Sequence, residues 1–389
     1  MEPYMDNNLV EDHLVSSNME EILKMNGLDP EKFRNSDKII REVMPRILRN
    51  RKDSGLEGLV GDLAAVIINT EIDRQKPAVE EMMGNTGLSF EGCFDEGDMI
   101  TAVMKRKGSA DFLIRHRKTG INHFRNDNLN PKSEHLPDTR LETFVFHVKD
   151  IDKYVRIQKE RGVRFLQDQI IRRDNYSFIQ TMPSRFTGNS LGFIQWHQNT
   201  GDYRSAEDND LEWYIEEPDR PAIRKVSELD HAATRLHAED KDAAIIEFME
   251  LTNYRFEFAI YVKMMNSITN VARLSKGTYA QVFTTGISPI KDLKTSGPTE
   301  KFVYNYGKRV HHIAFNTPNI EDAFNEMKAN AQGFLIDLVG SPGEGLKQTF
   351  TTGSRNTLLV NEYIHRYGDF DGFFTKSNVT LLTEATDIQ

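Results

Sequence analysis

The sequence predicts an α+β protein in which two similar halves, each built of two βαβββ-like units, follow a helical N-terminal extension. The first observation is an internal repeat. An apolar strand pattern from Phe144, a helix pattern and a short apolar run ending at Leu166 recur from Ile313 to Leu335. The second observation is that strand and helix patterns follow the same order on both sides of an acidic, proline-containing segment. Together they indicate two tandem domains.

The domain limits follow from these changes of pattern. Apolar residues recur at helical spacing in 18–25 and 36–48, so the first residues read as a packing or oligomerisation extension. We expect this extension at 1–58, an N-terminal domain at 59–200, a linker at 201–223 and a C-terminal domain at 224–389.

Strand and helix patterns fill both domains. In the first domain we expect strands at 63–69, 99–105, 110–115, 141–148, 177–181 and 192–197, and helices at 77–83 and 150–161. In the second domain we expect strands at 227–234, 256–260, 279–284, 309–317, 347–351 and 357–365, and helices at 242–250 and 319–328.

Composition excludes several classes of function. The 389 residues carry a formal net charge of −10, so no general attraction to nucleic acid or an anionic membrane is expected. The single cysteine, Cys93, excludes an internal disulfide framework and a cysteine-rich metal site. No apolar run approaches the ~18 residues of a membrane span, and the N-terminus has no apolar signal region. We expect a soluble protein of the cytoplasm.

The stretch from Arg309 to Thr317 carries the main chemical signal, two adjacent histidines in a short apolar strand. Successive strand side chains point to opposite faces, so His311 and His312 are expected to point apart, with one of them placed to bind something. We interpret His312 as one ligand of a mononuclear metal site.

His231 and Glu362 are the proposed partners of His312, because they lie on strands of the same repeated half. Two imidazoles and one carboxylate can bind one face of a divalent metal and leave the opposite positions open. That arrangement suits non-haem iron(II) oxygen chemistry, although zinc or manganese would accept the same ligands. A lone histidine on a strand is more often structural. A glutamate within the apolar run 358–364 is harder to explain, because burying an unpaired carboxylate is costly.

Several segments resemble 4-hydroxyphenylpyruvate dioxygenase, of the vicinal oxygen chelate superfamily. The first three are Leu229-Asp-His231, Val310-His-His-Ile-Ala314 and Asn361-Glu362, which is followed by Ile364-His-Arg366. They resemble the three metal-ligand segments of the family. Further similarity is found in Gln348-Thr-Phe-Thr351, Gly372-Phe373 and Asn378-Val-Thr-Leu-Leu382, the last two in the family's C-terminal segment, whose helix closes over the site. The resemblance covers roughly 60–389 and is strongest in the C-terminal half.

This resemblance implies tandem vicinal-oxygen-chelate domains and an Fe(II)-dependent dioxygenase that oxidatively decarboxylates a 2-oxo acid with O₂. Fe(II) would be the cofactor, held by His231, His312 and Glu362. The pocket would be lined by the residues of the matched segments: Gln348, Phe350, Phe373 and Asn378.

The departures from the family pattern point to an altered substrate. His311 stands where the family has glutamine, so it is a candidate for substrate selection. Val360 and Val379 replace two phenylalanines, which removes two aromatic faces from the pocket. The remaining departures are Thr284 to Pro289 in place of an Asn-Glu-Pro segment, and Phe374 and Ser377 in place of glycines.

The N-terminal half is expected to have lost the triad, since its corresponding strands offer only Ile68 or Asn69, His147, and the run 195–197. Two alternatives stay open, namely an extradiol ring-cleaving dioxygenase with the same ligands and a non-catalytic small-ligand-binding member of the superfamily. The expected partners are a small-molecule substrate, O₂ and a second copy of the chain in a homodimer, with no nucleic acid or membrane.

Overall fold

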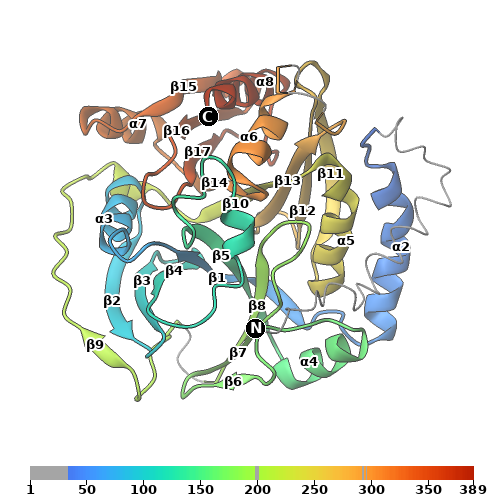
Figure 1. Ribbon diagram of the computed structural model, residues 1–389. Helices are drawn as coiled ribbons and strands as arrows, with labels where there is room; N and C mark the ends of the chain where they lie inside the picture. Colours follow the sequence, from blue (N-terminus) through green and yellow to red (C-terminus); the bar gives the residue numbers. More distant parts are fainter. Residues whose placement is uncertain (1–33, 198–200, 291–292, 295) are drawn as a thin grey trace, which may run out of the picture.

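The computed structural model describes residues 34–197, 201–290, 293–294 and 296–389. Two curled, mixed sheets form its framework (Figure 1), and the two-half architecture is confirmed. One sheet has the strand order β6-β7-β8-β5-β1-β4-β3-β2-β9 and the other β11-β12-β13-β10-β14-β17-β16-β15. We call them the N-terminal and the C-terminal sheet.

The N-terminal sheet and its helices lie within 60–211. The strands are β1 (Val60–Asn69), β2 (Ser89–Asp95), β3 (Met99–Lys105), β4 (Asp111–Arg117), β5 (Arg140–Val148), β6 (Ile171–Arg172), β7 (Tyr176–Gln180), β8 (Ser190–Trp196) and β9 (Asn209–Leu211). The α-helices are α3 (Gln75–Asn85) and α4 (Ile151–Glu160). The edge strand β9 lies within the segment expected to be a linker and pairs with β2.

The C-terminal sheet repeats this plan. Its strands are β10 (Leu229–Arg235), β11 (Arg255–Val262), β12 (Ser267–Arg273), β13 (Ala280–Gly286), β14 (Arg309–Asn316), β15 (Phe334–Ser341), β16 (Leu346–Thr351) and β17 (Val360–Arg366). Its helices are α5 (Lys241–Leu251), α6 (Pro298–Tyr306), α7 (Ile320–Ala329) and α8 (Lys376–Ala385), followed by the 3₁₀ turn η7 (Thr386–Ile388).

Most predicted elements are present, and the omissions have a physical cause. β12 was missed because its polar side chains do not alternate with apolar ones, and all seven of its residues are buried. A strand covered on both faces loses the period-two pattern. The expected helix at 18–25 lies outside the described residues, and the one at 36–48 is part of α2 (Lys38–Asp53).

One apolar core joins the two halves. Residues from both sheets form a single buried cluster, in which Phe112 of β4 stacks on Phe315 of β14 at 5.9 Å between ring centroids. α2 packs beside α5 (Figure 1), and buried Arg51 of α2 donates hydrogen bonds to the carbonyl oxygens of Met249 in α5 and of Tyr254 just after it. The extension helix therefore fastens to the C-terminal half.

Three neighbouring strands position the candidate site. β14 pairs antiparallel with β10 and parallel with β17. The registers place His231 opposite Ala314, and Ala314 opposite Glu362. Residues that are far apart in the sequence thus share one row across the middle of the sheet.

No helix in the described part of the chain is long and apolar enough to cross a membrane. The homodimer stays a prediction.

Candidate metal centre

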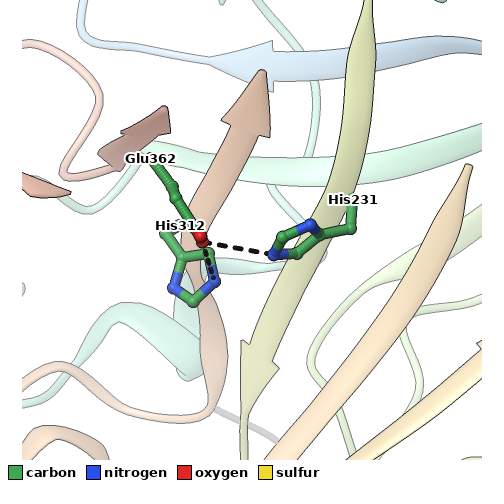
Figure 2. Close-up of side chains that lie close together, drawn as sticks. All are labelled: His231, His312 and Glu362. Carbon is green, nitrogen blue, oxygen red and sulfur yellow. Dashed lines mark ion pairs between the residues drawn. The ribbon is translucent and has the colours of Figure 1, made fainter. Parts of the chain in front are cut away.

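His231, His312 and Glu362 meet inside the C-terminal sheet. All three are buried, and one ligand atom from each lies within 4.8 Å of the others. The Nε2 atoms of both imidazoles lie 3.2 Å from Oε2 of Glu362. Figure 2 shows both rings directed at this one carboxylate oxygen from separate strands. Within the described residues no other group of three histidine, cysteine or acidic side chains converges in this way.

A β-bulge precedes each histidine ligand. Between Leu229 and His231 the strand β10 has one residue more than its partner, and between Val310 and His312 the extra residue is on β14. A bulge breaks the alternation of side chains and re-aims them, and bulges are common next to active sites. The expectation that His311 and His312 point apart is therefore wrong, because their Nδ1 atoms lie 2.8 Å from each other.

The bulge residue Asp230 fixes the orientation of His231. Its Oδ2 lies 2.7 Å from Nδ1 of His231. A carboxylate can only accept, so Nδ1 of His231 carries the proton and Nε2 presents its lone pair. Arg366 donates to both oxygens of Asp230, at 2.6 and 3.0 Å, and holds the carboxylate in place.

The second bulge residue, His311, fixes the orientation of His312. Oε1 of Gln389 lies 2.7 Å from Nε2 of His311 and can only accept, so His311 is protonated at Nε2. Its Nδ1 then accepts from Nδ1 of His312. His312 consequently presents the lone pair of Nε2 to the centre.

Gln348 and Asn378 hold Glu362. Nε2 of Gln348 donates to Oε1 of Glu362 at 2.7 Å, which leaves Oε2 free for the centre. Nδ2 of Asn378, on α8, donates in turn to Oε1 of Gln348 at 3.1 Å. Gly340 lies against Asn378: it has φ +91°, and a Cβ there would overlap the carbonyl oxygen of Leu346 and lie 2.6 Å from Nδ2 of Asn378.

Aromatic rings cover the centre. The Phe350 ring lies 4.9 Å from that of His312, and the Phe373 ring 5.3 Å from that of His231. Val360 packs with Phe350 in one buried cluster, and Val379 of α8 is also buried. Because these rings and α8 close over the site, water is largely excluded from it.

Electrostatics favours one cation at this point. Burial opposes a charge on His231, but the carboxylates of Glu362 and Asp230 outweigh it and raise the pKa of His231 to about 9. Burial and positive neighbours hold the pKa of His312 well below its ordinary value. The buried carboxylates therefore favour a positive charge at the centre.

The donor set fits a divalent metal. Nε2 of both histidines and Oε2 of Glu362 are buried, and none of them has a hydrogen-bond partner outside the triad. The opposite atom of each ligand is held by Asp230, His311 or Gln348. Ligands whose second polar atom is fixed in this way are typical of metal sites. Two imidazoles and one carboxylate form a facial triad.

The N-terminal sheet has apolar or small residues at the equivalent positions. Its registers place Ala65, Thr143 and Gly192 where the C-terminal sheet has His231, His312 and Glu362, rather than the residues expected from the sequence. A Cβ on Gly192 would lie 2.9 Å from the ring of Phe178. An apolar cluster therefore occupies the space that the triad occupies in the other half.

Two positioning residues, Asp230 and Arg366, were not predicted. The available signals were that Asp230 directly precedes a ligand, and that Arg366 lies four residues after Glu362 on the same strand face. A cavity of about 180 Å³ lies elsewhere, between the halves, and none of the three ligands lines it.

No family model and no curated protein matches the sequence. Solved structures do match the fold. A triple mutant of 4-hydroxymandelate synthase from Streptomyces coelicolor superposes with a TM-score of 0.64 and 14% identity, over 85% of this chain and 98% of that one. A xylose isomerase-like TIM barrel/4-hydroxyphenylpyruvate dioxygenase fusion protein gives 0.56 and 11%, over 90% of this chain and 57% of the fusion. A halotolerant catechol dioxygenase, BphC, gives 0.50 and 9%, over 81% and 90%.

These structures share the architecture of the vicinal oxygen chelate superfamily. The chain therefore has the fold of two tandem vicinal oxygen chelate domains, as the resemblance implied. Within that superfamily its neighbours include a 4-hydroxyphenylpyruvate dioxygenase fusion and a catechol dioxygenase. At 9–14% identity the likeness shows the fold alone.

Proposed function

We propose that the protein is a non-haem Fe(II)-dependent dioxygenase that oxidatively decarboxylates a 2-oxo acid. One observation carries the proposal. Three buried ligand atoms of His231, His312 and Glu362 converge with no hydrogen-bond partner outside the triad, and neighbouring side chains direct the lone pairs of both imidazoles to that point. Such an arrangement is costly unless a cation lies there. The fold shared with known dioxygenases supports the choice of chemistry.

Bound iron would supply O₂ activation and chelation of the 2-oxo acid at the positions that the facial triad leaves open. The chain supplies the rest. Asp230 and His311 keep the two imidazoles in the ligating tautomer. Gln348 directs one oxygen of Glu362 to the centre. Phe350 and Phe373 exclude water from the reacting groups.

Substrate binding is proposed for the side of the centre that faces α8. Phe350, Phe373, Val360 and Val379 would provide its apolar walls, while Gln348 and Asn378 would provide its polar groups. With valines at two positions, the pocket offers fewer aromatic faces for a hydroxyphenyl ring. A substrate other than 4-hydroxyphenylpyruvate is therefore expected.

The test is anaerobic loading with Fe(II) followed by oxygen uptake with a panel of 2-oxo acids and a panel of catechols. We expect one bound iron per chain, and uptake with CO₂ release only in the 2-oxo acid panel. Glu362→Ala and His312→Ala should lose both iron and activity. His147→Ala, a half-buried histidine of the N-terminal sheet, is the matched control and should keep both.

The outcomes separate the three functions. Uptake with catechols alone would establish the extradiol reaction instead. Ligand binding that is unchanged in Glu362→Ala, without oxygen uptake, would establish a non-catalytic binding protein.

A further inference from the structure

Arg235 is a cationic residue on the same face of the C-terminal sheet as the metal centre. It lies on β10 four residues after His231, and the pairing of β10 with β13 is regular from His231–Ala280 to Arg235–Thr284. Strand side chains alternate, so His231 and Arg235 are directed to the same side of the sheet. Arg235 is 5% exposed.

The guanidinium has only neutral neighbours. Its Nη2 donates to the hydroxyl of Thr386 at 2.8 Å, and its Cζ lies 5.0 Å from the centre of the Phe302 ring. The same ring contacts His311 edge to face at 4.9 Å, so Arg235 lies near the ligand cluster. Nη1 is buried and has no hydrogen-bond partner. No ion pair joins Arg235 to a carboxylate in the part of the chain that the structure describes.

In this respect Arg235 differs from Arg366 and Arg273, whereas its strand partner Arg309, which is also buried, has no ion pair among the described residues either. Arg366 is paired with Asp230, and Arg273 with Glu257 and Asp371. Burial alone lowers the pKa of Arg235, to about 9, so its charge is retained at neutral pH. A buried guanidinium without a counter-ion is costly. An arginine at such a position is therefore suited to binding a carboxylate through paired donors.

The charge balance of the interior also points to a carboxylate as the ligand of Arg235. A divalent ion with Glu362 leaves one positive charge, which the chelating carboxylate of a 2-oxo acid would neutralise. The charge of Arg235 then remains. A second carboxylate on the same substrate would neutralise it and would replace the hydroxyl of Thr386 by a stronger acceptor.

We propose that Arg235 binds a second carboxylate of the substrate, which would make the substrate a 2-oxo dicarboxylic acid. This inference rests on the proposed function and names its substrate class. Four residues of extended strand separate the Cα atoms of His231 and Arg235 by about 13 Å, part of which the arginine side chain covers. The spacer between the two acidic ends of the substrate is accordingly a few carbon atoms or one ring.

The experiment compares matched pairs of 2-oxo acids that differ only in the distal carboxylate. The pairs are 2-oxoglutarate with 2-oxopentanoate, 2-oxoadipate with 2-oxohexanoate, and 4-carboxyphenylpyruvate with phenylpyruvate. Oxygen uptake of the Fe(II) enzyme gives kcat and KM. Calorimetric titration of the Zn(II)-loaded protein gives binding without turnover.

We expect wild type to prefer at least one dicarboxylate in both measurements. In Arg235→Gln, kcat/KM and affinity for that compound should fall about 100-fold, mainly through KM, because one partner of a buried charge pair is lost. The matched monocarboxylate should change by no more than about threefold. Arg235→Lys keeps the charge and should retain part of the preference. Arg115→Gln, which removes a paired arginine of the N-terminal sheet, is the control and should leave the preference unchanged.

Three results would overturn the inference while leaving the proposed function intact: equal use of both members of every pair by wild type, a wild-type preference for the monocarboxylates, or an equal loss for both members in Arg235→Gln. If Arg235→Gln does not fold, the inference is tested by whether wild type and Arg235→Lys prefer the dicarboxylate over its matched monocarboxylate. Absence of oxygen uptake and of binding with every compound would overturn the proposed function itself.

Discussion

The hydrogen bond from His231 to Asp230 gives the most direct test of the metal centre. Asp230→Asn keeps the size of the side chain but removes its charge. The amide can still accept from His231, but its NH₂ group then faces Arg366, which at present donates two hydrogen bonds to the carboxylate. The substitution therefore weakens the support of His231 without changing any of the three proposed metal ligands.

The expected loss of metal affinity follows from the weakened hydrogen bond between His231 and Asp230. The Asp230–His231 contact is 2.7 Å long and part of a buried, charge-assisted network, in which one bond contributes about 1.5–3 kcal/mol. Replacement of residues that orient metal ligands costs about 10- to 100-fold in metal affinity, which is about 1.4–2.7 kcal/mol. The two estimates agree, so we expect affinity to fall by this factor while the fold is kept.

Competition with a fluorescent chelator for Zn(II) and for Fe(II) under anaerobic conditions measures the affinity, and a thermal melt checks folding. Asp95→Asn is the matched control, because Asp95 is paired with Lys118 on the N-terminal sheet. Its metal affinity should equal that of wild type. A folded Asp230→Asn protein that binds metal within twofold of wild type would show that this contact does not orient the ligand.

Three further predictions follow from single contacts. His311→Leu removes the acceptor of the Nδ1–H of His312 and should weaken metal binding by about 10-fold, whereas His311→Gln keeps an acceptor and should cost less; equal losses in chelator competition would contradict this. Burial raises the pKa of Glu300 from 4.5 to about 7, so the folded state binds its proton more tightly than the unfolded chain does. The free energy of unfolding should therefore fall by up to about 3 kcal/mol between pH 4.5 and 8, and urea titrations should show a smaller fall in Glu300→Gln. Gly340→Ala places a Cβ against the carbonyl oxygen of Leu346 and the Asn378 amide at φ +91°, and we expect loss of about 1–3 kcal/mol of stability and reduced oxygen uptake; a variant as stable and active as wild type would refute this.

The repeat and the ligand triad could be predicted from the sequence because their signals are local. His312 and Glu362 lie in apolar runs, each beside one other polar residue, and these polar pairs are visible without coordinates. The order of strands and helices followed from periodicity in the same way. β12 and β15 were missed because neither shows a clean alternation of buried and exposed residues.

The orientation of the site could not be predicted in this way. Each β-bulge depends on the register between two strands, and a shift of one residue moves a side chain to the other face. His311 was therefore expected to point away from His312, although the two imidazoles are in contact. For the same reason the equivalent positions in the N-terminal sheet, Ala65 and Gly192 among them, were not those chosen from the sequence.

The sequence by itself determined the fold class and the two-fold repeat, since strand periodicity is a property of short segments. The three residues proposed as metal ligands came from the same sequence through its polar residues in apolar strands and its resemblance to 4-hydroxyphenylpyruvate dioxygenase. Tertiary structure decided which atoms of those ligands face the centre, because Asp230, His311 and Gln348 reach them only through bulges and neighbouring strands. It also left Arg235 without a counter-ion. Such a property belongs to the whole interior, because it depends on which charges the folded chain brings near one another.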